Sequence, residues 1–282
     1  MVVRNEPRKG GRIVIVSLFG KKQRTAGEIV AAARDSQKIT GTELISELFP
    51  DFMEMHGDRL NDDDPSIIGG LAHFAGQAVT VLVIDKGLSA KDRIAKHFGS
   101  PAPAAYRKSL RLIKQAEKFN RPVLAFVNTA GAYPAASAEE QGQGEAIARN
   151  LLEIAGVRVP ILTIIYGEGG SGGALALACG DQVWMTENSM YSVLSPEGFA
   201  SILWKDGSRA AEAAELMKIT APELRELGIV DRVIPETFNG EQLPRYKVAH
   251  IMKKALIERL TELVRFDQHE LLEKRYKRFR QY

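Results

Sequence analysis

The sequence predicts an α/β protein whose helices pack on a sheet. Three apolar, β-branched runs carry this prediction, and each is followed by a turn and a segment with apolar residues at helical spacing. The three pairs of strand and helix are 78–84 with 100–120, 121–128 with 137–156, and 159–167 with the small-residue segment after it. Repetition of strand, turn and helix along one chain is typical of helices layered on a sheet.

Helical patterns flank this region on both sides. Residues 25–56 place apolar residues three and four apart, with Thr40 or Thr42 as N-cap, which predicts a helical arm. The prolines that open 100–120 suit a helix start, whereas Gly142 and Gly144 weaken the helix over 137–156. The tail from Tyr246 onward predicts one long or broken amphipathic helix with a solvated, basic face and an apolar docking stripe.

Composition narrows the function classes. The 38 Lys and Arg residues against 35 Asp and Glu leave a formal charge of +3, too small to favour nucleic acid as the main partner. The single cysteine, Cys179, excludes a disulfide framework within the chain and a cysteine-cluster zinc site, and we expect a small buried residue there. Residues 1–24 resemble a signal peptide only faintly, and no apolar run reaches the roughly 18 residues that a membrane helix needs, so we expect a cytoplasmic protein without a membrane span.

The stretch GEGGSGGALALACG, from Gly167 to Gly180, concentrates glycines between an apolar run and small residues. Gly169 to Gly173 match the G-x-S-x-G pattern of a serine-hydrolase elbow, but the only histidines after Ser171 are His250 and His269, both in the polar tail. A Walker phosphate loop would need Lys and Ser or Thr after the glycines, and a Rossmann fingerprint would need an acidic residue at a strand end about 20 residues later. Glu187 instead falls in a predicted turn, so neither pattern fits.

The remaining interpretation is a main-chain oxyanion site. A strand that ends in glycines and enters a helix presents backbone N–H groups without a Cβ in the way, at the positive end of the helix dipole. The alternative, close packing of small residues between helix and sheet, is compatible with it. A second strand-to-helix turn, at Gly131, has the same arrangement, and we expect both turns to meet at one pocket.

Five ordered blocks of sequence then resemble a known family, the α subunits of bacterial acetyl-CoA carboxylase carboxyltransferase. The blocks are HGDR at 56–59, GSPAPAAYRKSLRL at 99–112, GAYPAASAEEQGQGEAIARNL at 131–151, GEGGSGGALALACGD at 167–181 and YSVLSPEGFASILWKD at 191–206. The resemblance runs from about Thr25 to IVDRVIPE at 229–236. Ordered blocks over most of a chain are far more specific than any single motif.

The resemblance implies an α/β crotonase-like fold of repeated β-β-α units with an N-terminal helical arm and a C-terminal helix. It divides the chain into an unassigned segment 1–24, a helical arm 25–60, a crotonase-like carboxyltransferase domain 61–240 and a C-terminal helical extension 241–282. In such enzymes the carboxyl group of carboxybiotin, carried on a biotin carboxyl carrier protein, moves to acetyl-CoA and gives malonyl-CoA, the first committed step of fatty acid synthesis.

The resemblance also implies partners and an absence of resident cofactors. The α subunit provides the biotin side of a shared site, and a β subunit that bears a zinc ribbon provides the CoA side in an α2β2 heterotetramer. Biotin carboxylase acts with the assembly only indirectly, through the carrier. We expect neither a metal nor a covalently bound cofactor on this chain.

The family pattern assigns roles to particular residues. The amides of Gly172, Gly173 and Ala174 face the ureido oxygen of biotin, and the ureido nitrogen freed of its carboxyl takes the proton from acetyl-CoA, so no side-chain base is needed. Lower-ranked candidates for the carboxybiotin side are, in chain order, Gly131, Ala132, Tyr133, Pro134, Gly169, Gly170, Ser195, Pro196, Glu197 and Gly198. Packing is an equal alternative for Tyr133 and Pro134, and a helix-starting role for Glu197.

Three further residues have less specific roles. His56 is expected to join the arm to the sheet. Lys86 and Gly87 end a strand where a ligand phosphate could approach, although a surface lysine is the simpler interpretation.

The sequence departs from the family pattern at the second turn. The family usually has Asp-Thr-Pro before GAYP and a glycine after it, whereas this chain has Asn128, Thr129 and Ala130, and then Ala135. Without the proline and the glycine the backbone of this turn has different conformational limits, which affects the geometry of the turn but not the fold.

Two alternatives stay open at this stage. One is a self-contained crotonase-fold hydratase or decarboxylase that uses Glu139, Glu140 or Glu145. The other is a nucleic-acid-binding protein, motivated by the basic tail, whose RNA affinity would fall steeply with salt.

Overall fold

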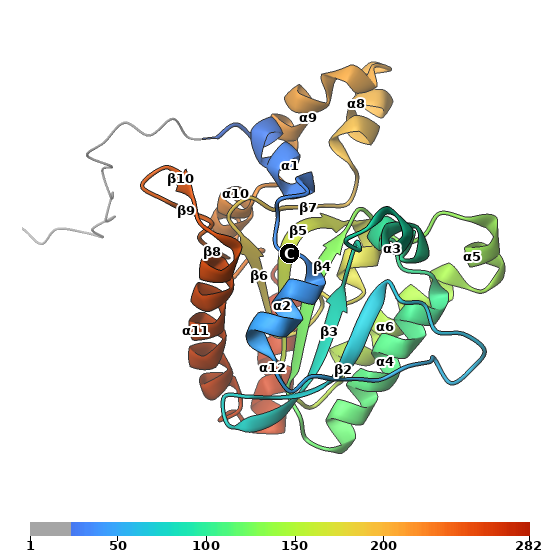
Figure 1. The fold of residues 1–282 in the computed structure, drawn as a ribbon, viewed down its shortest axis with the longest axis vertical. Helices are drawn as coiled ribbons and strands as arrows, with labels where there is room; N and C mark the ends of the chain where they lie inside the picture. The colour runs from blue at the N-terminus through green and yellow to red at the C-terminus, as the bar shows by residue number, and fades with distance from the viewer. Residues whose placement is uncertain (1–23) are drawn as a thin grey trace, which may run out of the picture.

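The computed structural model describes residues 24–282 and shows a mixed sheet covered by helices on both faces (Figure 1). The unassigned segment and the signal-peptide-like pattern fall almost wholly on residues 1–23, outside the described residues. The strand order is β1-β2-β3-β4-β5-β6-β8, and β7 pairs with the end of β5. The strands of this sheet are β1 Met53–Glu54, β2 Ile67–Phe74, β3 Gln77–Ile84, β4 Val123–Thr129, β5 Ile161–Gly170, β6 Gln182–Thr186, β7 Met190–Ser192 and β8 Arg232–Ile234.

The first part of the sheet is an antiparallel hairpin and the rest is parallel. Strands β2 and β3 pair antiparallel around Ala75 and Gly76, whose φ values of 51° and 78° are those of the tight turn that matches strand twist. From β3 through β4, β5 and β6 to β8 every pairing is parallel. The carboxyl ends of these strands therefore meet at one edge, where loops from distant parts of the chain come together.

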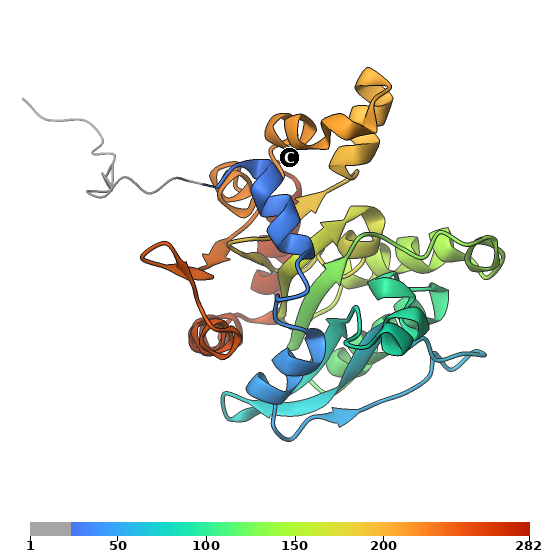
Figure 2. The same cartoon turned by 45° about the horizontal axis from the view of Figure 1, so that its top comes forward.

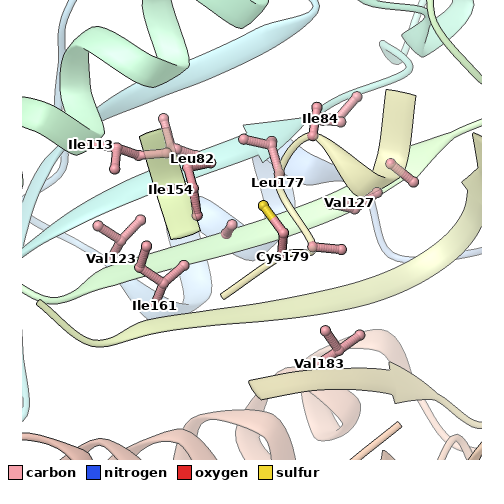
Figure 3. Close-up of a cluster of buried hydrophobic side chains, with 14 of the residues drawn as sticks. Leu82, Ile84, Ile113, Val123, Val127, Ile154, Ile161, Leu177, Cys179 and Val183 are labelled. Atoms are coloured by element: carbon pink, nitrogen blue, oxygen red, sulfur yellow. The ribbon is translucent and has the colours of Figure 1, made fainter. Parts of the chain in front are cut away.

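The central strands are buried on both faces. In β4, Val123, Ala125 and Val127 belong to one hydrophobic cluster, while Leu124 and Phe126 belong to another on the opposite face. Figure 3 shows part of the first cluster, with Cys179 among aliphatic side chains. This alternation explains why the three strand runs contain almost no polar residue.

Each face has its own helices. The first cluster lies under α4 (Pro103–Lys118), α6 (Gln143–Ala155) and α10 (Ala221–Glu226), and the second under α2 (Gly41–Leu48) and α11 (Arg245–Leu263). The remaining short elements are α3 Ala90–Ala95, the 3-10 helices η1 His97–Gly99 and η2 Gly207–Arg209, α5 Ala136–Glu140, α7 Ser171–Leu175, β9 Thr237–Phe238 and β10 Glu241–Gln242.

Helices α8 (Pro196–Trp204) and α9 (Ala210–Met217) project beyond the sheet beside α1 (Ala26–Arg34), as Figures 1 and 2 show. We call α8 and α9 with their connection, 196–217, the projecting lobe. A small cluster of buried residues joins α1 to the lobe and to the strand before it: Ala26, Val30, Ala33, Met190, Ala214 and Ile219.

The predicted helical arm is only partly helical. Thr40, one of the two residues predicted as N-cap, caps α2 with a full capping box. The helix then ends at Leu48. Pro50 cannot continue a helix and restricts the residue before it, so the chain becomes extended and Met53 pairs with Leu71 of the sheet. The prediction of helix through residue 56 is therefore wrong.

Two other long helical predictions are interrupted. Gly142, at φ 83°, separates α5 from α6, while Gly144 lies within α6. The tail breaks after Val264, and Asp267 caps a second helix, α12 (Gln268–Phe279). Seven residues of α11 are buried, which confirms the apolar docking stripe: Val248, Ala249, Met252, Ala255, Leu256, Leu260 and Leu263.

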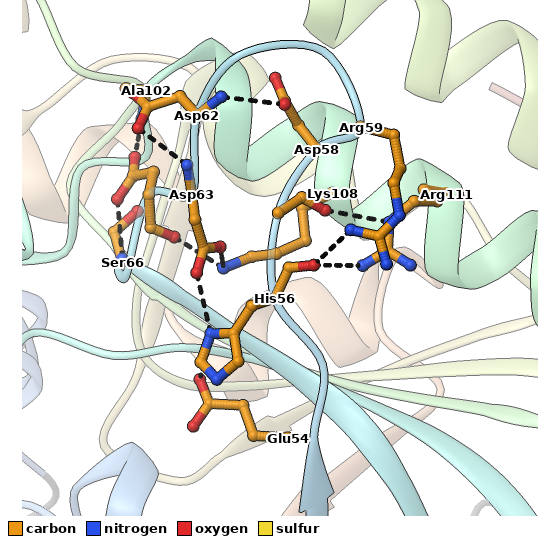
Figure 4. Close-up of polar contacts among 12 residues, drawn as sticks. Glu54, His56, Asp58, Arg59, Asp62, Asp63, Ser66, Ala102, Lys108 and Arg111 are labelled. Carbon is orange, nitrogen blue, oxygen red and sulfur yellow. Dashed lines mark hydrogen bonds and ion pairs between the residues drawn. The ribbon is translucent and has the colours of Figure 1, made fainter.

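The segment between β1 and β2 is fastened to α4 by charged side chains (Figure 4). Lys108, with its side chain 1% exposed, donates to Asp63 Oδ1 at 2.6 Å and to the Asp64 carbonyl at 2.8 Å. His56 Nδ1 lies 2.8 Å from Asp63 Oδ2, and Arg111 donates to the carbonyls of His56 and Gly57. His56 thus helps to hold the segment after β1 against α4, through its carbonyl, whereas the expectation was a junction between the arm and the sheet.

Within residues 24–282 no helix is long and apolar enough to cross a membrane, and no group of three or more His, Cys, Asp or Glu side chains is arranged to hold a metal ion. The domain boundaries after residues 24, 60 and 240 stay predictions.

Candidate active site

The glycine stretch is a strand-to-helix turn at the carboxyl edge of the sheet. Strand β5 ends at Gly170, and the short helix α7 begins at Ser171. Ser171 is exposed and has a φ of 49°, a left-handed conformation that side chains rarely adopt. Gly172 is half-buried and Gly173 is buried, so the amides of the first helical turn lie at the surface edge of the core.

The backbones of the two glycine turns lie in contact; that they share a pocket stays a prediction. A Cβ added to Gly170 would lie 2.0 Å from the carbonyl oxygen of Ala130, and one added to Gly173 would lie 2.6 Å from the nitrogen of Ala132. No side chain fits at either position, because backbone rather than a movable side chain occupies the space. Gly172 differs: its nearest neighbour would be Ile147 Cγ2, at an ordinary 3.5 Å.

The turn after β4 is closed by its own threonine. The Thr129 hydroxyl accepts from the Gly131 N–H at 3.0 Å and donates to the Gly131 carbonyl at 2.8 Å. Gly131 has a φ of 151°, at the limit of the region that favours glycine. Ala132 and Tyr133 are half-buried and Pro134 is exposed.

Tyr106 supports the glycine turn from below. Its side chain is fully buried on α4, and its hydroxyl donates to the Gly173 carbonyl at 3.2 Å. Burial raises the pKa of the Tyr106 hydroxyl, so it remains a donor.

A bulge redirects the end of β5. The register of β4 and β5 shifts between Val127 and Thr129, where the Asn128 side chain occupies the space beside Gly167. Asn128 Oδ1 accepts from the Glu168 N–H at 3.0 Å. Bulges of this kind aim a strand end in a new direction, here toward the second turn.

The departures from the family pattern fit this geometry. Asn128 supplies the acceptor for Glu168, and Ala130 is exposed and has no positive φ. Ala135 is the N-cap of α5 at φ −101°, which any residue adopts. The turn therefore needs neither the proline nor the second glycine.

Tyr133 stacks on a histidine. The ring of His97 lies parallel to it, with a centroid distance of 4.0 Å, and the Tyr133 N–H donates to the Pro101 carbonyl at 3.0 Å. His97 and Phe98 have left-handed φ values of 48° and 54°. Strained backbone therefore lies directly beside the second turn.

The Ser195–Gly198 segment lies farther along the same edge. Strand β7 pairs with the end of β5, with Gly170 opposite Ser192, and α8 begins shortly after it. Ser195 is the N-cap of α8 and accepts from the Gly198 N–H at 3.1 Å, and Pro196 is buried. Glu197 occupies the first turn, where an acidic residue stabilises a helix.

Charged residues surround the end of β5. Glu168, 5% exposed, forms ion pairs with Lys86 and with Arg34, whose Nε lies 2.7 Å from Glu168 Oε1. Lys86 is thus held by a buried carboxylate. Beside this pair lies a hollow of ≈ 110 Å³, lined in part by Arg34, Lys86, Gly87, Phe98, Asn128 and Tyr166.

The hydrolase and hydratase residues are not assembled. Among the hydrogen bonds of residues 24–282, none joins Ser171 to a histidine, and His250 is an exposed residue of α11. Glu139, Glu140 and Glu145 lie on exposed faces of α5 and α6.

Sequence reasoning missed Glu168, Arg34 and Tyr106 as parts of this site. Glu168 carried a signal, because it is the only charged residue in the apolar strand β5. Arg34 and Tyr106 carried none, since their partners lie 134 and 67 residues away in the chain.

Solved structures share this architecture. The chain is similar to a transcarboxylase 12S with methylmalonyl-coenzyme A bound (TM-score 0.65, 18% identity, 81% of this chain and 43% of that one). It is also similar to a subunit of a Pseudomonas malonate decarboxylase hetero-tetramer in complex with coenzyme A (TM-score 0.66, 17% identity, 83% of this chain and 91% of that one). The beta subunit of geranyl-CoA carboxylase from P. aeruginosa gives a TM-score of 0.61 at 18% identity, over 85% of this chain and 46% of that one. These likenesses define the class, an α/β crotonase-like fold, and confirm the fold that the sequence predicted.

Sequence relatives define the family within this class. Residues 20–282 match the family described as acetyl co-enzyme A carboxylase carboxyltransferase-like, and the chain belongs to it. Relatives named acetyl-coenzyme A carboxylase carboxyl transferase subunit alpha, from Streptococcus pyogenes serotype M5 (strain Manfredo) and Streptococcus equi subsp. equi (strain 4047), are 59% identical to it over 256 residues. The match covers 90% of this chain and 98% of each relative.

Proposed function

We propose that the chain is the α subunit of an acetyl-CoA carboxylase carboxyltransferase and transfers a carboxyl group from carboxybiotin to acetyl-CoA, giving malonyl-CoA. The observation that carries the proposal is the contact between the two glycine turns, which leaves no room for a Cβ at Gly170 or Gly173. Family membership supports the reaction type. Biotin reaches the site as a substrate on the biotin carboxyl carrier protein.

The glycine turn suits the charge that this reaction develops. When the carboxyl group leaves the biotin nitrogen, negative charge grows on the ureido oxygen, and fixed backbone donors stabilise it without reorganisation. Gly172 and Gly173 occupy the first turn of α7, where amides have no partner within the helix. One such donor is typically worth about 3 to 4 kcal/mol of the barrier.

The three nominated amides are not equivalent in this proposal. Ala174 is the fourth residue of α7, one position beyond the first-turn amides of Gly172 and Gly173. The Ala174 methyl is fully buried in the core. We therefore assign the donor role to Gly172 and Gly173, and a packing role to Ala174.

The other candidates frame these amides. The turn that faces them consists of Gly131, Ala132, Tyr133 and Pro134. The strand end that meets this turn consists of Gly169 and Gly170. Helix α8 lies next along the same sheet edge, and its start consists of Ser195, Pro196, Glu197 and Gly198. In our proposal they shape the carboxybiotin side of the site.

A partner chain completes the site. Large apolar side chains are exposed on the projecting lobe, including Ile202 at 66%, Leu203 at 56% and Leu216 at 59%. Exposed apolar surface of this kind is typical of an interface. We propose that it contacts the zinc-ribbon β subunit in an α2β2 heterotetramer, in the cytoplasm.

The test is carboxyl transfer measured as biotin-dependent decarboxylation of malonyl-CoA to acetyl-CoA. We expect activity when this chain is mixed with the zinc-ribbon β subunit of the same cell, and none from this chain alone. Folded and associated subunits that show no transfer would contradict the proposal, and transfer by this chain alone would favour a self-contained enzyme.

A further inference from the structure

Four charged residues connect segments that are far apart in the sequence at the end of β5. Glu168 is two residues before Gly170, and its side chain is 7% exposed. Lys86, just after β3, and Arg34, the last residue of α1, both pair with it. Burial alone would raise the pKa of the Glu168 carboxyl, but the two cations outweigh it and the pKa is lowered, so Glu168 is ionised.

Arg34 extends the connection to the projecting lobe. Its Nη1 lies 2.6 Å from Glu197 Oε1 and its Nη2 lies 3.2 Å from Glu197 Oε2, in addition to the Nε contact with Glu168. One planar guanidinium therefore holds the end of β5 and the first turn of α8 at the same time. A guanidinium is suited to this because its donors have a fixed geometry.

Stability does not account for the contact between Arg34 and Glu197. The side chains of Arg34 and Glu197 are 35% and 46% exposed, and ion pairs this open contribute little to folding. Helix α1 is also fixed without Arg34: its Thr25 cap is complete, the Ala26 N–H donates to Glu215 Oε1 at 2.6 Å, and Gly27 packs against Ala211.

The geometry points to Arg34 as a positioning residue for the glycine turn. By holding Glu168 against Glu197, it fixes the last residues of β5, and with them the first-turn amides of α7, relative to the start of the projecting lobe. This inference rests on the proposed carboxyl transfer at Gly172 and Gly173. It adds a link between the lobe that we assign to partner binding and the turn that we assign to charge stabilisation.

The test uses the mixed complex of this chain with the β subunit, and measures kcat and the KM values for biotin and malonyl-CoA. We expect Arg34→Ala to lower kcat roughly 10- to 100-fold, since misplacement of a reacting group by about 1 Å costs about 10²-fold. The KM for malonyl-CoA and assembly should stay near those of the wild type, and the chain should remain folded because Lys86 still pairs with Glu168. Arg34→Lys, which reaches only one carboxylate at a time, should restore part of kcat.

A double-variant cycle separates positioning from a general structural effect. If Arg34 acts through Glu197, Glu197→Gln should lower kcat in the wild type but not further in Arg34→Ala. The matched control is Arg245→Ala, because Arg245 forms a similarly exposed ion pair between distant segments, with Glu43 of α2, Nη1 to Oε1 at 3.0 Å, away from the lobe and the glycine turns. That variant should keep kcat.

The outcomes distinguish this inference from the function on which it rests. A wild-type complex without any transfer sinks the proposed function. An active wild-type complex in which Arg34→Ala retains kcat within about twofold, or in which the two losses simply add, overturns the positioning role alone.

Discussion

Arg275 of α12 and Asp181, before β6, form a buried ion pair with Nη2 and Oδ2 2.7 Å apart. Arg275 is only 2% exposed, and its remaining donors bond three backbone carbonyls, those of Ile154, Val157 and Val159. The C-terminal helix is therefore held by one guanidinium whose donors are fully used. This pair gives the first of four predictions.

Replacement of Arg275 by Ala should destabilise the chain by about 3–5 kcal/mol, because it leaves the buried Asp181 carboxylate without its cation, although the Ile161 N–H still donates to it. Urea unfolding followed by circular dichroism measures this loss. Lys277→Ala on the same helix, with a side chain that is 76% exposed, should change stability by less than about 0.5 kcal/mol. Equal effects of the two variants would show that the buried pair has no special role.

Gly172 and Gly173 offer a matched pair for the oxyanion proposal. Gly173→Ala places a methyl 2.6 Å from the Ala132 nitrogen, so the two turns must separate, and we expect kcat to fall roughly 10²- to 10³-fold. Gly172→Ala keeps the amide and meets only Ile147 at 3.5 Å within the chain, so kcat should fall less than for Gly173→Ala, through crowding of the substrate oxygen alone. Carboxyl-transfer assays on both variants, each mixed with the β subunit, measure the two kcat values. Similar values would show that close packing of the two turns at Gly173 is not needed for catalysis.

The ionised Glu168 predicts how stability depends on pH. Its pKa lies below the ordinary 4.5, so its contribution is complete above that value and is lost as the pH falls below it. We expect Glu168→Gln to lower stability at neutral pH and to converge with the wild type in acid. Unfolding free energies at about pH 7 and at steps down to about pH 2.5, well below the ordinary pKa of the carboxyl, test this. Parallel curves for both proteins would mean that Glu168 gains nothing from its partners.

The exposed apolar residues of the projecting lobe should matter for assembly and not for folding. Ile202→Ser with Leu216→Ser should weaken association with the β subunit and change the stability of the isolated chain by less than about 0.5 kcal/mol. Sedimentation velocity at several concentrations measures the association. Leu152→Ser is the control, since Leu152 is 75% exposed on α6, outside the lobe; unchanged assembly of the lobe variant would place the interface elsewhere.

Much of the fold could be predicted from the sequence because its signals are local. The continuous apolar run VLAFVN predicted a strand, and Thr40 was one of the two residues predicted to start the helix α2. The break after Leu48 was missed although Pro50 stood in the sequence, because the apolar spacing of MEM continued the helical pattern.

The sequence predicted the site only through the glycines of its two strand-to-helix turns. Gly170 and Gly173 marked the first turn, since the backbone of the second turn leaves no room for a Cβ at either position, whereas Gly131 marked the second turn through its φ of 151°. No sequence pattern indicated the contacts of Arg34 with Glu168 and Glu197, because ion pairs between distant segments depend on how the strands are ordered in the folded sheet. Long-range electrostatics therefore had to come from the structure.

The burial of Cys179 has a practical consequence for measuring motion in the assembled enzyme. It is the only cysteine of the chain, and burial raises the pKa of its thiol to about 12, so at neutral pH it stays protonated and unreactive toward alkylating dyes. A cysteine introduced at exposed Leu152 of α6, outside the proposed interface, would then be the sole labelling point in this subunit. Fluorophore distances between α6 and a labelled carrier protein become measurable without first removing a native thiol.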